Sequence, residues 1–296
     1  MSIFILGIIA VAYTLENQVD EDKDIKTRVE SVNNFVFSME EDLERQLYTA
    51  GYRAIFIAED NISREGRYIE DFEDFFLGAV INGTGTKNSS DVMEGAKISD
   101  IKENIKRDAE KMNVEINFSN TSVSVGQESP WNVRITMNFS YVIEDKSGLA
   151  SWEGSESVFS DIGITNFEDP IYTLETGGAL FRKFHQTPYE GNYSSGEDVS
   201  HLEEHIENKY YAANNRSPDF MSRFEGSFSA DENGVESFVN IPDMDSQNLD
   251  TEEKSCLDYI YFSNESPPYE TISGLPEWVK IDDDHLKKYQ VENLTK

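Results

Sequence analysis

The sequence predicts an α+β protein. A long hydrophobic-then-amphipathic helix and further helical segments come first, followed by an antiparallel β-meander and a smaller C-terminal α+β region. Three observations carry this prediction: apolar residues recur every three or four positions between residues 25 and 57, the apolar period changes to two after residue 114, and no proline occurs before Pro130. Helices followed by a run of strands are typical of the α+β class.

The composition restricts the partners and the chemistry. The chain has 296 residues, with 57 Asp and Glu against 25 Lys and Arg, which gives a net charge of −32. Because phosphate binding requires a basic face, this charge argues against nucleic acid as a partner. The single cysteine, Cys256, excludes an intrachain disulfide and any Cys-based zinc or haem motif, and its apolar surroundings predict a buried, inert thiol.

Residues 1–19 are predicted to form a membrane or filament anchor. Residues 1–15 carry no charge and are apolar on every face of a helix. Such a helix spans roughly 22 Å, less than the ~30 Å hydrocarbon core of a bilayer. A buried core helix is the alternative. A processed terminus and a start inside a longer transmembrane helix both fit the anchor, whereas a cleavable signal peptide would begin with a basic residue.

Residues 20–185 are predicted to form a stem helix and an α+β head domain. The apolar stripe of the stem has a near-heptad spacing, and acidic residues lie off it. Aromatic residues such as Phe35 and Tyr48 widen the apolar surface, so packing on the protein's own domain is favoured over a free coiled coil. Two shorter helical patterns follow, near 69–79 and 98–112.

The strands of the head alternate apolar and polar residues. The clearest is 132–143, and a return strand follows around residues 152–158. Residues 186–199 are rich in Gly, Ser and Pro and are predicted to be a linker or a long exposed loop. Residues 200–296 then form a second α+β domain. Its patterns indicate a short helix over about 199–213, a hairpin at 223–241 and short strands near 259–262 and 278–281.

Acceptor sites of the form Asn-X-Ser/Thr are the strongest functional signal. With 22 asparagines and 44 serines and threonines, a random order would give about three such sites, whereas the chain has ten. The excess predicts an extracytoplasmic protein that carries N-linked glycans, although crowding of polar residues in loops is the alternative. The predicted glycosylation sites are Asn61, Asn82, Asn88, Asn117, Asn120, Asn138, Asn192, Asn215, Asn264 and Asn293.

Many acceptor sites without a disulfide form an unusual combination. Secreted eukaryotic proteins with dense acceptor sites usually contain disulfides. An archaeal surface protein has no such requirement, and an acid-rich surface suits a high-salt habitat, where ions screen the repulsion between negative charges. An acidic, solvated surface without adaptive meaning is the alternative.

The uncharged apolar start, the long amphipathic helix and the β-rich head together resemble archaeal type IV pilin-like proteins. The resemblance covers residues 1–60 as a pattern and lacks both a basic leader and a Glu near the start of the apolar run. It implies self-assembly through bundled N-terminal helices. Separately, FEDPIYTLETGG (167–178) and CLDYIYFSN (256–264) resemble blocks in uncharacterised membrane-anchored proteins of small-genome archaea, which implies a location and no activity.

The sharpest chemical motif is His201-Leu-Glu-Glu204-His205. It fits the H-x-x-E-H pattern of inverted zincins, with two histidines one helical turn apart as zinc ligands and Glu204 as the base. A third ligand is missing from the pattern, because Glu207 is too near and too generic. Ser200 and Glu203 also form a capping box, which explains Glu203 structurally.

Other acidic groups offer weaker metal-binding patterns. Asp243 with Asp245, and the run 282–284, place carboxylates where a hard cation could bind. Neither fits an EF-hand, because Asn248 and Lys254 occupy the positions that require Gly and Glu, so solvated loop acids are favoured. No nucleophile elbow, Walker loop or dinucleotide-binding loop occurs in the sequence, and no cofactor is predicted.

These patterns favour a non-enzymatic cell-surface protein, membrane-anchored, with an extracytoplasmic C-terminal part. A structural or adhesive role follows, and a homo-oligomeric, pilin-like filament subunit is its most concrete form. A membrane-anchored zinc-dependent hydrolase that uses His201, Glu204 and His205 is the alternative.

Overall fold

The computed structural model describes the backbone of residues 2–146, 148 and 151–296, and the side chains of these residues from Lys26 onward. It combines helices with antiparallel sheet, which confirms the predicted α+β class. The side chains of the expected anchor, residues 1–19, lie outside the described ones. Within the described part of the chain, no helix is both long and apolar enough to cross a membrane.

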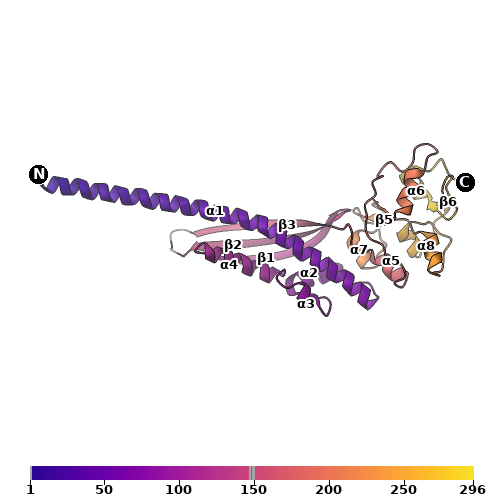
Figure 1. Cartoon of the computed structure of the whole chain (residues 1–296), viewed down its shortest axis with the longest axis horizontal. Helices are drawn as coiled ribbons and strands as arrows, with labels where there is room; N and C mark the ends of the chain where they lie inside the picture. The colour runs from indigo at the N-terminus through magenta and orange to yellow at the C-terminus, as the bar shows by residue number, and fades with distance from the viewer. Residues whose placement is uncertain (1, 147, 149–150) are drawn as a thin grey trace. The chain divides into compact units, whose positions relative to one another are not determined.

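The first half of the chain supplies helices and then a three-stranded sheet, in which β2 lies between β1 and β3 (Figure 1). Local signals set several boundaries: the Asp71 side chain accepts a hydrogen bond from Asp74 N at the start of α2, and Gly83, with φ +69°, ends it. The elements are α1 (Ser2–Glu65), α2 (Phe72–Asn82), α3 (Ser89–Val92), α4 (Ile98–Lys111), β1 (Val114–Ser129), β2 (Asn132–Asp145) and β3 (Ser151–Gly163).

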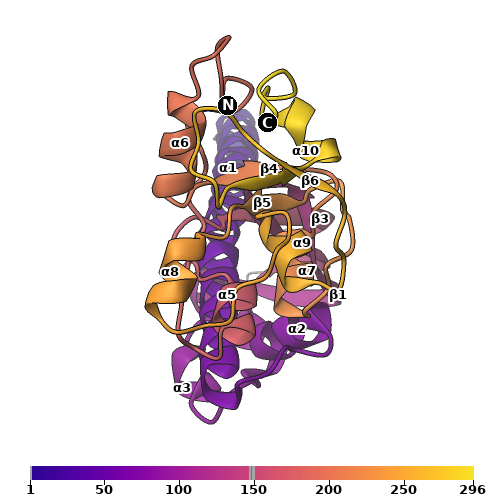
Figure 2. The same cartoon turned by 90° about the vertical axis from the view of Figure 1, so that its right-hand side faces the viewer.

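The second half consists of short elements joined by long loops (Figure 2). Its strands form two antiparallel pairs, β4 with β5 and β6 with β7. The elements are α5 (Pro170–Glu175), α6 (Ser200–Glu207), β4 (Tyr211–Ala213), α7 (Phe220–Phe224), β5 (Val235–Ser237), α8 (Ile241–Ser246), α9 (Asp258–Phe262), β6 (Tyr269–Thr271), β7 (Lys280–Asp282) and α10 (Asp283–Lys288).

The chain divides into two compact units, and α1 and the three long strands contribute to both. The boundaries expected from the sequence, 20–185 and 200–296, do not coincide with these units. Unit 1 comprises Met1–Leu47, Ile98–Val123 and Thr136–Ser160, and unit 2 comprises Tyr48–Lys97, Ser124–Ile135 and Asp161–Lys296.

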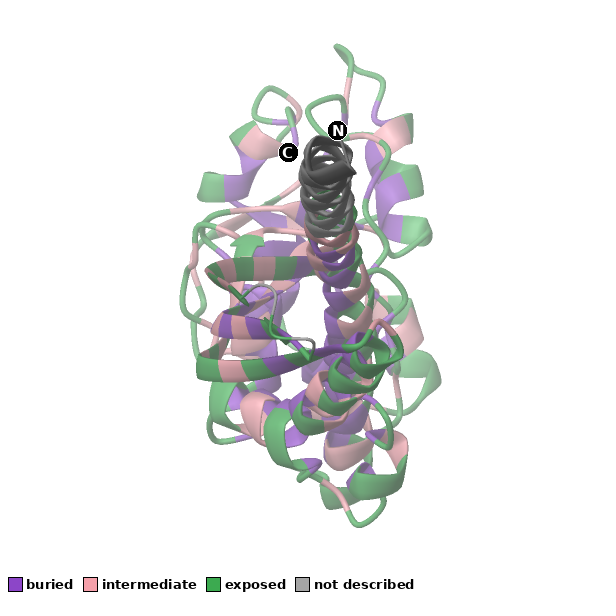
Figure 3. Ribbon diagram, turned by 90° about the vertical axis from the view of Figure 1, so that its left-hand side faces the viewer, coloured by how far each residue is buried: buried purple, intermediate pink, exposed green. Residues whose placement is uncertain are grey.

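In unit 1, the helices follow the period of 3.6 residues and the strands the period of 2 that the sequence shows. More buried positions alternate with more exposed positions along β2 and β3 (Figure 3), and β2 follows the predicted alternation. The α1 stripe contributes the buried side chains of Val32, Phe35 and Met39. An ion pair between Arg28 on α1 and Asp145 at the end of β2, with 2.7 Å between Nη2 and Oδ1, adds a polar contact.

Unit 2 has a larger core, to which the C-terminal part of α1 and most short elements contribute. Gly51 allows α1 to lie close to β3, because a Cβ at this position would meet the Ile162 side chain at 2.6 Å. Aromatic rings fill the core between α2, α7 and the loop before β4; the ring centroids of Phe72 and Phe224 are 4.9 Å apart. Cys256 is buried in this core, and burial raises the pKa of its thiol to about 11.

Two local expectations for unit 2 are wrong. The segment 223–241 is not a hairpin, because β5 pairs with β4, with Tyr211 opposite Ser237. Residues 259–262 lie in α9 rather than in a strand, since their aromatic and β-branched side chains pack in the core from a helix turn. Residues 186–199, the expected linker or long exposed loop, lie within unit 2 and contain no helix or strand; most of their side chains are exposed, although Tyr193 is buried in the core.

Candidate functional sites

The two histidines of the H-x-x-E-H motif lie on α6 in different surroundings. His201 is half-exposed, its ring stacks on Tyr189 with 4.6 Å between centroids, and its Nδ1 lies 2.9 Å from the Asn192 carbonyl oxygen. Glu204 is exposed and accepts a hydrogen bond from the Tyr189 hydroxyl. The described residues contain no cluster of three or more His, Cys, Asp or Glu side chains that could hold a metal ion.

His205 is fully buried among aromatic rings, and neither of its ring nitrogens has a hydrogen-bond partner in the described part of the chain. Its neighbours include Tyr193, Phe238 and Tyr289, with centroids 5.3 to 5.8 Å away. Burial lowers the pKa of His205 to about 3, so the ring is neutral at pH 7. The expected capping box is also wrong, because Val199 occupies the N-cap position and Asp198, rather than Ser200, accepts a hydrogen bond from an amide at the start of α6, that of Ser200 at 3.0 Å.

We expect His205→Phe to raise the free energy of unfolding by about 1–2 kcal/mol at pH 7, because it removes two buried polar atoms that lack partners. The gain should increase as pH falls below 6.5, since protons then bind the unfolded histidine in preference to the folded one. Urea unfolding at pH 7 and pH 5 measures both effects. His205→Leu introduces a different apolar side chain and so tests whether overpacking by Phe hides the gain in stability. His201→Phe, at a half-exposed histidine of the same helix, is the control. A loss of stability in both buried-site variants would contradict the expectation.

The other acidic candidates have partners of their own. Asp243 forms an ion pair with Lys209, with 2.7 Å between the charged atoms, and Asp284 pairs with Arg216. Asp282 is buried and accepts a hydrogen bond from the Ser255 hydroxyl at 2.6 Å. The run 282–284 therefore does not present its three carboxylates together, since the first lies in the core and the second and third are exposed.

The most densely charged interior site surrounds Arg223, a fully buried residue on α7. Its Nη1 lies 2.6 Å from a carboxylate oxygen of Asp169 and 3.1 Å from one of Asp258. Burial lowers the pKa of Arg223, but the two carboxylates more than reverse this effect and keep it charged. Burial raises the pKa of Asp169.

Hydroxyl groups bond both carboxylates of this site. The Tyr211 hydroxyl donates to Asp169 and the Ser237 hydroxyl donates to Asp258, at 2.7 and 2.8 Å. These contacts tie α5, α7, β4, β5 and α9 together.

A second buried ionic group surrounds His285 on α10. Its Nδ1 lies 2.6 Å from Asp282 and its Nε2 lies 3.1 Å from Glu236. Burial alone would lower the pKa of His285, but the two carboxylates outweigh this effect and raise it to about 10. Burial alone would raise the pKa of Glu236, but the charge of His285 outweighs this effect and lowers it to about 2. Both groups are therefore charged at neutral pH. The Tyr289 hydroxyl donates a further hydrogen bond to Glu236, at 2.7 Å.

Sequence reasoning missed both ionic groups, although one signal was present. Asp169 lies in the block FEDPIYTLETGG and Asp258 in the block CLDYIYFSN, and the structure brings both blocks to Arg223. An acidic residue amid apolar and aromatic neighbours is such a signal, because a buried carboxylate requires a buried cation. The cation itself could not be identified from sequence spacing.

Glu59 on α1 is another perturbed carboxylate. Burial raises its pKa to about 7, and it accepts a hydrogen bond from the Glu168 backbone amide. A perturbed carboxylate in a cleft is a candidate acid or base. The cavity beside Glu59 holds only about 10 Å³, which is room for about one water molecule and not for an organic substrate.

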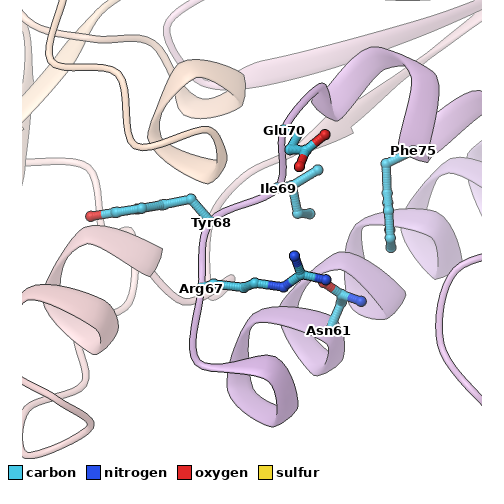
Figure 4. A pocket seen from close by; sticks show the side chains of 6 residues that line it. All are labelled: Asn61, Arg67, Tyr68, Ile69, Glu70 and Phe75. Atoms are coloured by element: carbon cyan, nitrogen blue, oxygen red, sulfur yellow. The ribbon is translucent and has the colours of Figure 1, made fainter.

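A surface pocket of about 300 Å³ lies where α1 ends and the chain turns into α2 (Figure 4). Tyr68 points away from the hollow, and its hydroxyl donates to Glu175 at 2.7 Å. The pocket is lined by Asn61, Arg67, Tyr68, Ile69, Glu70 and Phe75.

All ten predicted glycosylation sites lie on described residues. Nine of these asparagines are exposed, and the tenth, Asn61, is half-exposed. Asn138 lies on the exposed face of β2, as the strand pattern predicts, and Asn120 adopts a positive φ of 49° in β1. Accessible side-chain amides are required for glycan transfer, so every site satisfies this geometric condition.

Comparison of the chain with protein-family models, with curated protein sequences and with solved structures gave no match.

Proposed function

We propose that the protein is a cell-surface structural or adhesive protein, anchored through residues 1–19, with a glycosylated ectodomain. Its most concrete form is a pilin-like subunit whose N-terminal helices bundle with those of other copies. The proposal assigns no catalytic residue and no cofactor to the chain.

The observation that carries the proposal is the position on α1 from which the apolar side chains are buried. From Val32 onward the apolar stripe is buried in the protein's own core, whereas none of the side chains from Lys26 to Ser31 is buried. The uncharged run 1–15 precedes this stretch without buried side chains. If α1 is continuous from Ser2, the run lies more than one helical turn beyond the described core, and a membrane or other copies of the chain would cover it.

Two further observations support the proposal. The acceptor asparagines are accessible over the whole chain after the anchor. The two ionic groups of unit 2, around Arg223 and His285, are buried and internally paired, so their charges are satisfied by one another within the fold. A folded head with a sugar-bearing surface suits a structural or adhesive role.

We expect charges placed in the apolar run to abolish anchoring. In the full chain, Ile5→Asp with Ile9→Asp should reduce vesicle binding at least about 100-fold, because each Asp costs ~2.5–3.5 kcal/mol at the centre of an apolar helix. Cosedimentation with lipid vesicles and negative-stain microscopy for filaments provide the measurement.

Asn17→Asp with Gln18→Glu is the matched control, since it adds the same two charges outside the apolar run and should leave binding or filaments unchanged. Equal unfolding midpoints of the two variants would show that both fold. A double-Asp variant that still binds vesicles or still forms filaments would overturn the anchor.

A further inference from the structure

The pocket at the end of α1 contains an acceptor asparagine. The Asn61 side chain lines it, and Asn61-Ile62-Ser63 is one of the ten acceptor sequences. We propose that this pocket binds the first sugar of an N-linked glycan attached to Asn61. The inference rests on the proposed glycosylation of the ectodomain and adds where one glycan lies and what it does.

The chemistry of the lining suits a single sugar ring. Ile69 and Phe75 supply apolar surface, and Arg67 and Glu70 supply hydrogen-bond donors and acceptors for hydroxyl groups. Neither charged side chain forms a hydrogen bond or ion pair with another described residue, so both are available to a ligand. An apolar floor with a few polar groups, in a volume of about 300 Å³, is at the small end of the range for ligand pockets.

Attachment removes the main obstacle to such binding. A free monosaccharide would bind a shallow pocket weakly, but a sugar linked to Asn61 is held beside it at a high effective concentration. In the transfer, Asn61 Nδ2 loses a proton and bonds to the anomeric carbon of the sugar. The phosphate of a lipid-linked oligosaccharide donor leaves with the electrons of the broken C–O bond; the cell supplies donor and transferase.

The bound glycan would then stabilise the turn between α1 and α2 against local opening. This turn begins at Gly66, whose amide donates to the Ile62 carbonyl at 2.9 Å, and continues to Ile69, whose amide donates to the Phe224 carbonyl at 2.9 Å. A sugar in contact with Arg67 and Phe75 links the last turn of α1 to α2, which should slow the opening of these hydrogen bonds.

A second acceptor site provides an internal comparison. Asn293 also lines a pocket, of about 430 Å³, but the residues that line it include no aromatic side chain: Glu197, Ser273, Gly274, Asn293, Leu294 and Thr295. A glycan on Asn293 should therefore be held less firmly than one on Asn61.

The test uses the full chain produced in an N-glycosylating host, with mass spectrometry of each glycopeptide and hydrogen exchange of the amides of Gly66 and Ile69. Ser63→Ala removes the acceptor sequence without changing the pocket, and Ser63→Thr retains it. We expect exchange about tenfold faster in Ser63→Ala, which corresponds to ~1.4 kcal/mol, and no change in Ser63→Thr. Phe75→Leu should accelerate exchange while Asn61 remains modified.

Three results would overturn the inference. Equal exchange in Ser63→Ala and Ser63→Thr would show that the glycan does not contact the turn. An unmodified Asn61 alongside other modified sites would refute the inference and leave the proposed function intact. Absence of glycans at all ten sites would refute the glycosylated ectodomain as well.

Discussion

Replacing Arg223 with Met is expected to lower the free energy of unfolding by about 3–5 kcal/mol, because two buried carboxylates would lose their only charged partner in the described site. The Arg223 side chain has no exposure to solvent, so water cannot compensate for the loss. Urea unfolding of the full chain at pH 7 measures the change.

The matched control is Arg216→Met, which breaks the ion pair with Asp284 at the surface of the same unit. Both side chains of that pair are more than half exposed, so solvent screens the pair and the expected loss is much smaller than for Arg223→Met. Equal losses in the two variants would contradict a structural role for the Arg223 site.

A combined variant separates the charge from the packing. Arg223→Met with Asp169→Asn and Asp258→Asn removes the unpaired carboxylates and should recover part of the lost stability. In the single variant the loss should also shrink as pH falls, because burial raises the pKa of Asp169 and its protonation removes one of the unpaired charges. No recovery in either experiment would indicate that the guanidinium acts through packing alone.

The second large effect is a fall in stability above neutral pH that depends on His285. Its pKa is about 10 in the folded protein and 6.5 without the fold, so its contribution is complete below pH 6.5 and is lost as pH rises to about 10. The contribution of Glu236 to stability depends on pH in the opposite direction. Because its pKa falls from 4.5 in the unfolded chain to about 2 in the fold, this contribution is complete above pH 4.5 and is lost as pH falls towards 2.

We therefore expect the wild-type free energy of unfolding to fall by ~1 kcal/mol per pH unit between pH 7.5 and 9.5, which is ~2 kcal/mol over this window. Glu59, with a pKa of about 7, titrates below this window, whereas the Cys256 thiol, with a pKa of 9.0 in the unfolded chain and about 11 in the fold, adds to the fall in stability only above pH 9. Chemical unfolding at intervals of half a pH unit provides the curve.

His285→Gln should be less stable at pH 7 and should show a nearly flat profile over the same window, because the titrating group is gone. His185→Gln, at an exposed histidine, is the control and should retain the wild-type slope. A wild-type slope that persists in His285→Gln would assign the pH dependence to another group.

The sequence by itself determined the features that depend on short periods. The spacing of Val32, Phe35 and Met39 predicts the buried stripe of α1, and strict alternation predicts β2. The exposed position of Asn138 follows from the same alternation. These patterns are readable because a helix or a long strand against one core repeats the same environment every few residues.

Only the tertiary structure decided the interior of unit 2. Its elements are mostly three to eight residues long, too short for a periodic pattern, so pairing of β5 with β4 and the helical form of 258–262 depend on distant contacts. The ionic groups depend on the same contacts: Arg223 meets carboxylates 54 and 35 positions away, and His285 meets Glu236 across 49 positions. Burying a charge requires a partner, but the sequence does not state which distant residue supplies it, because only folding brings the two together.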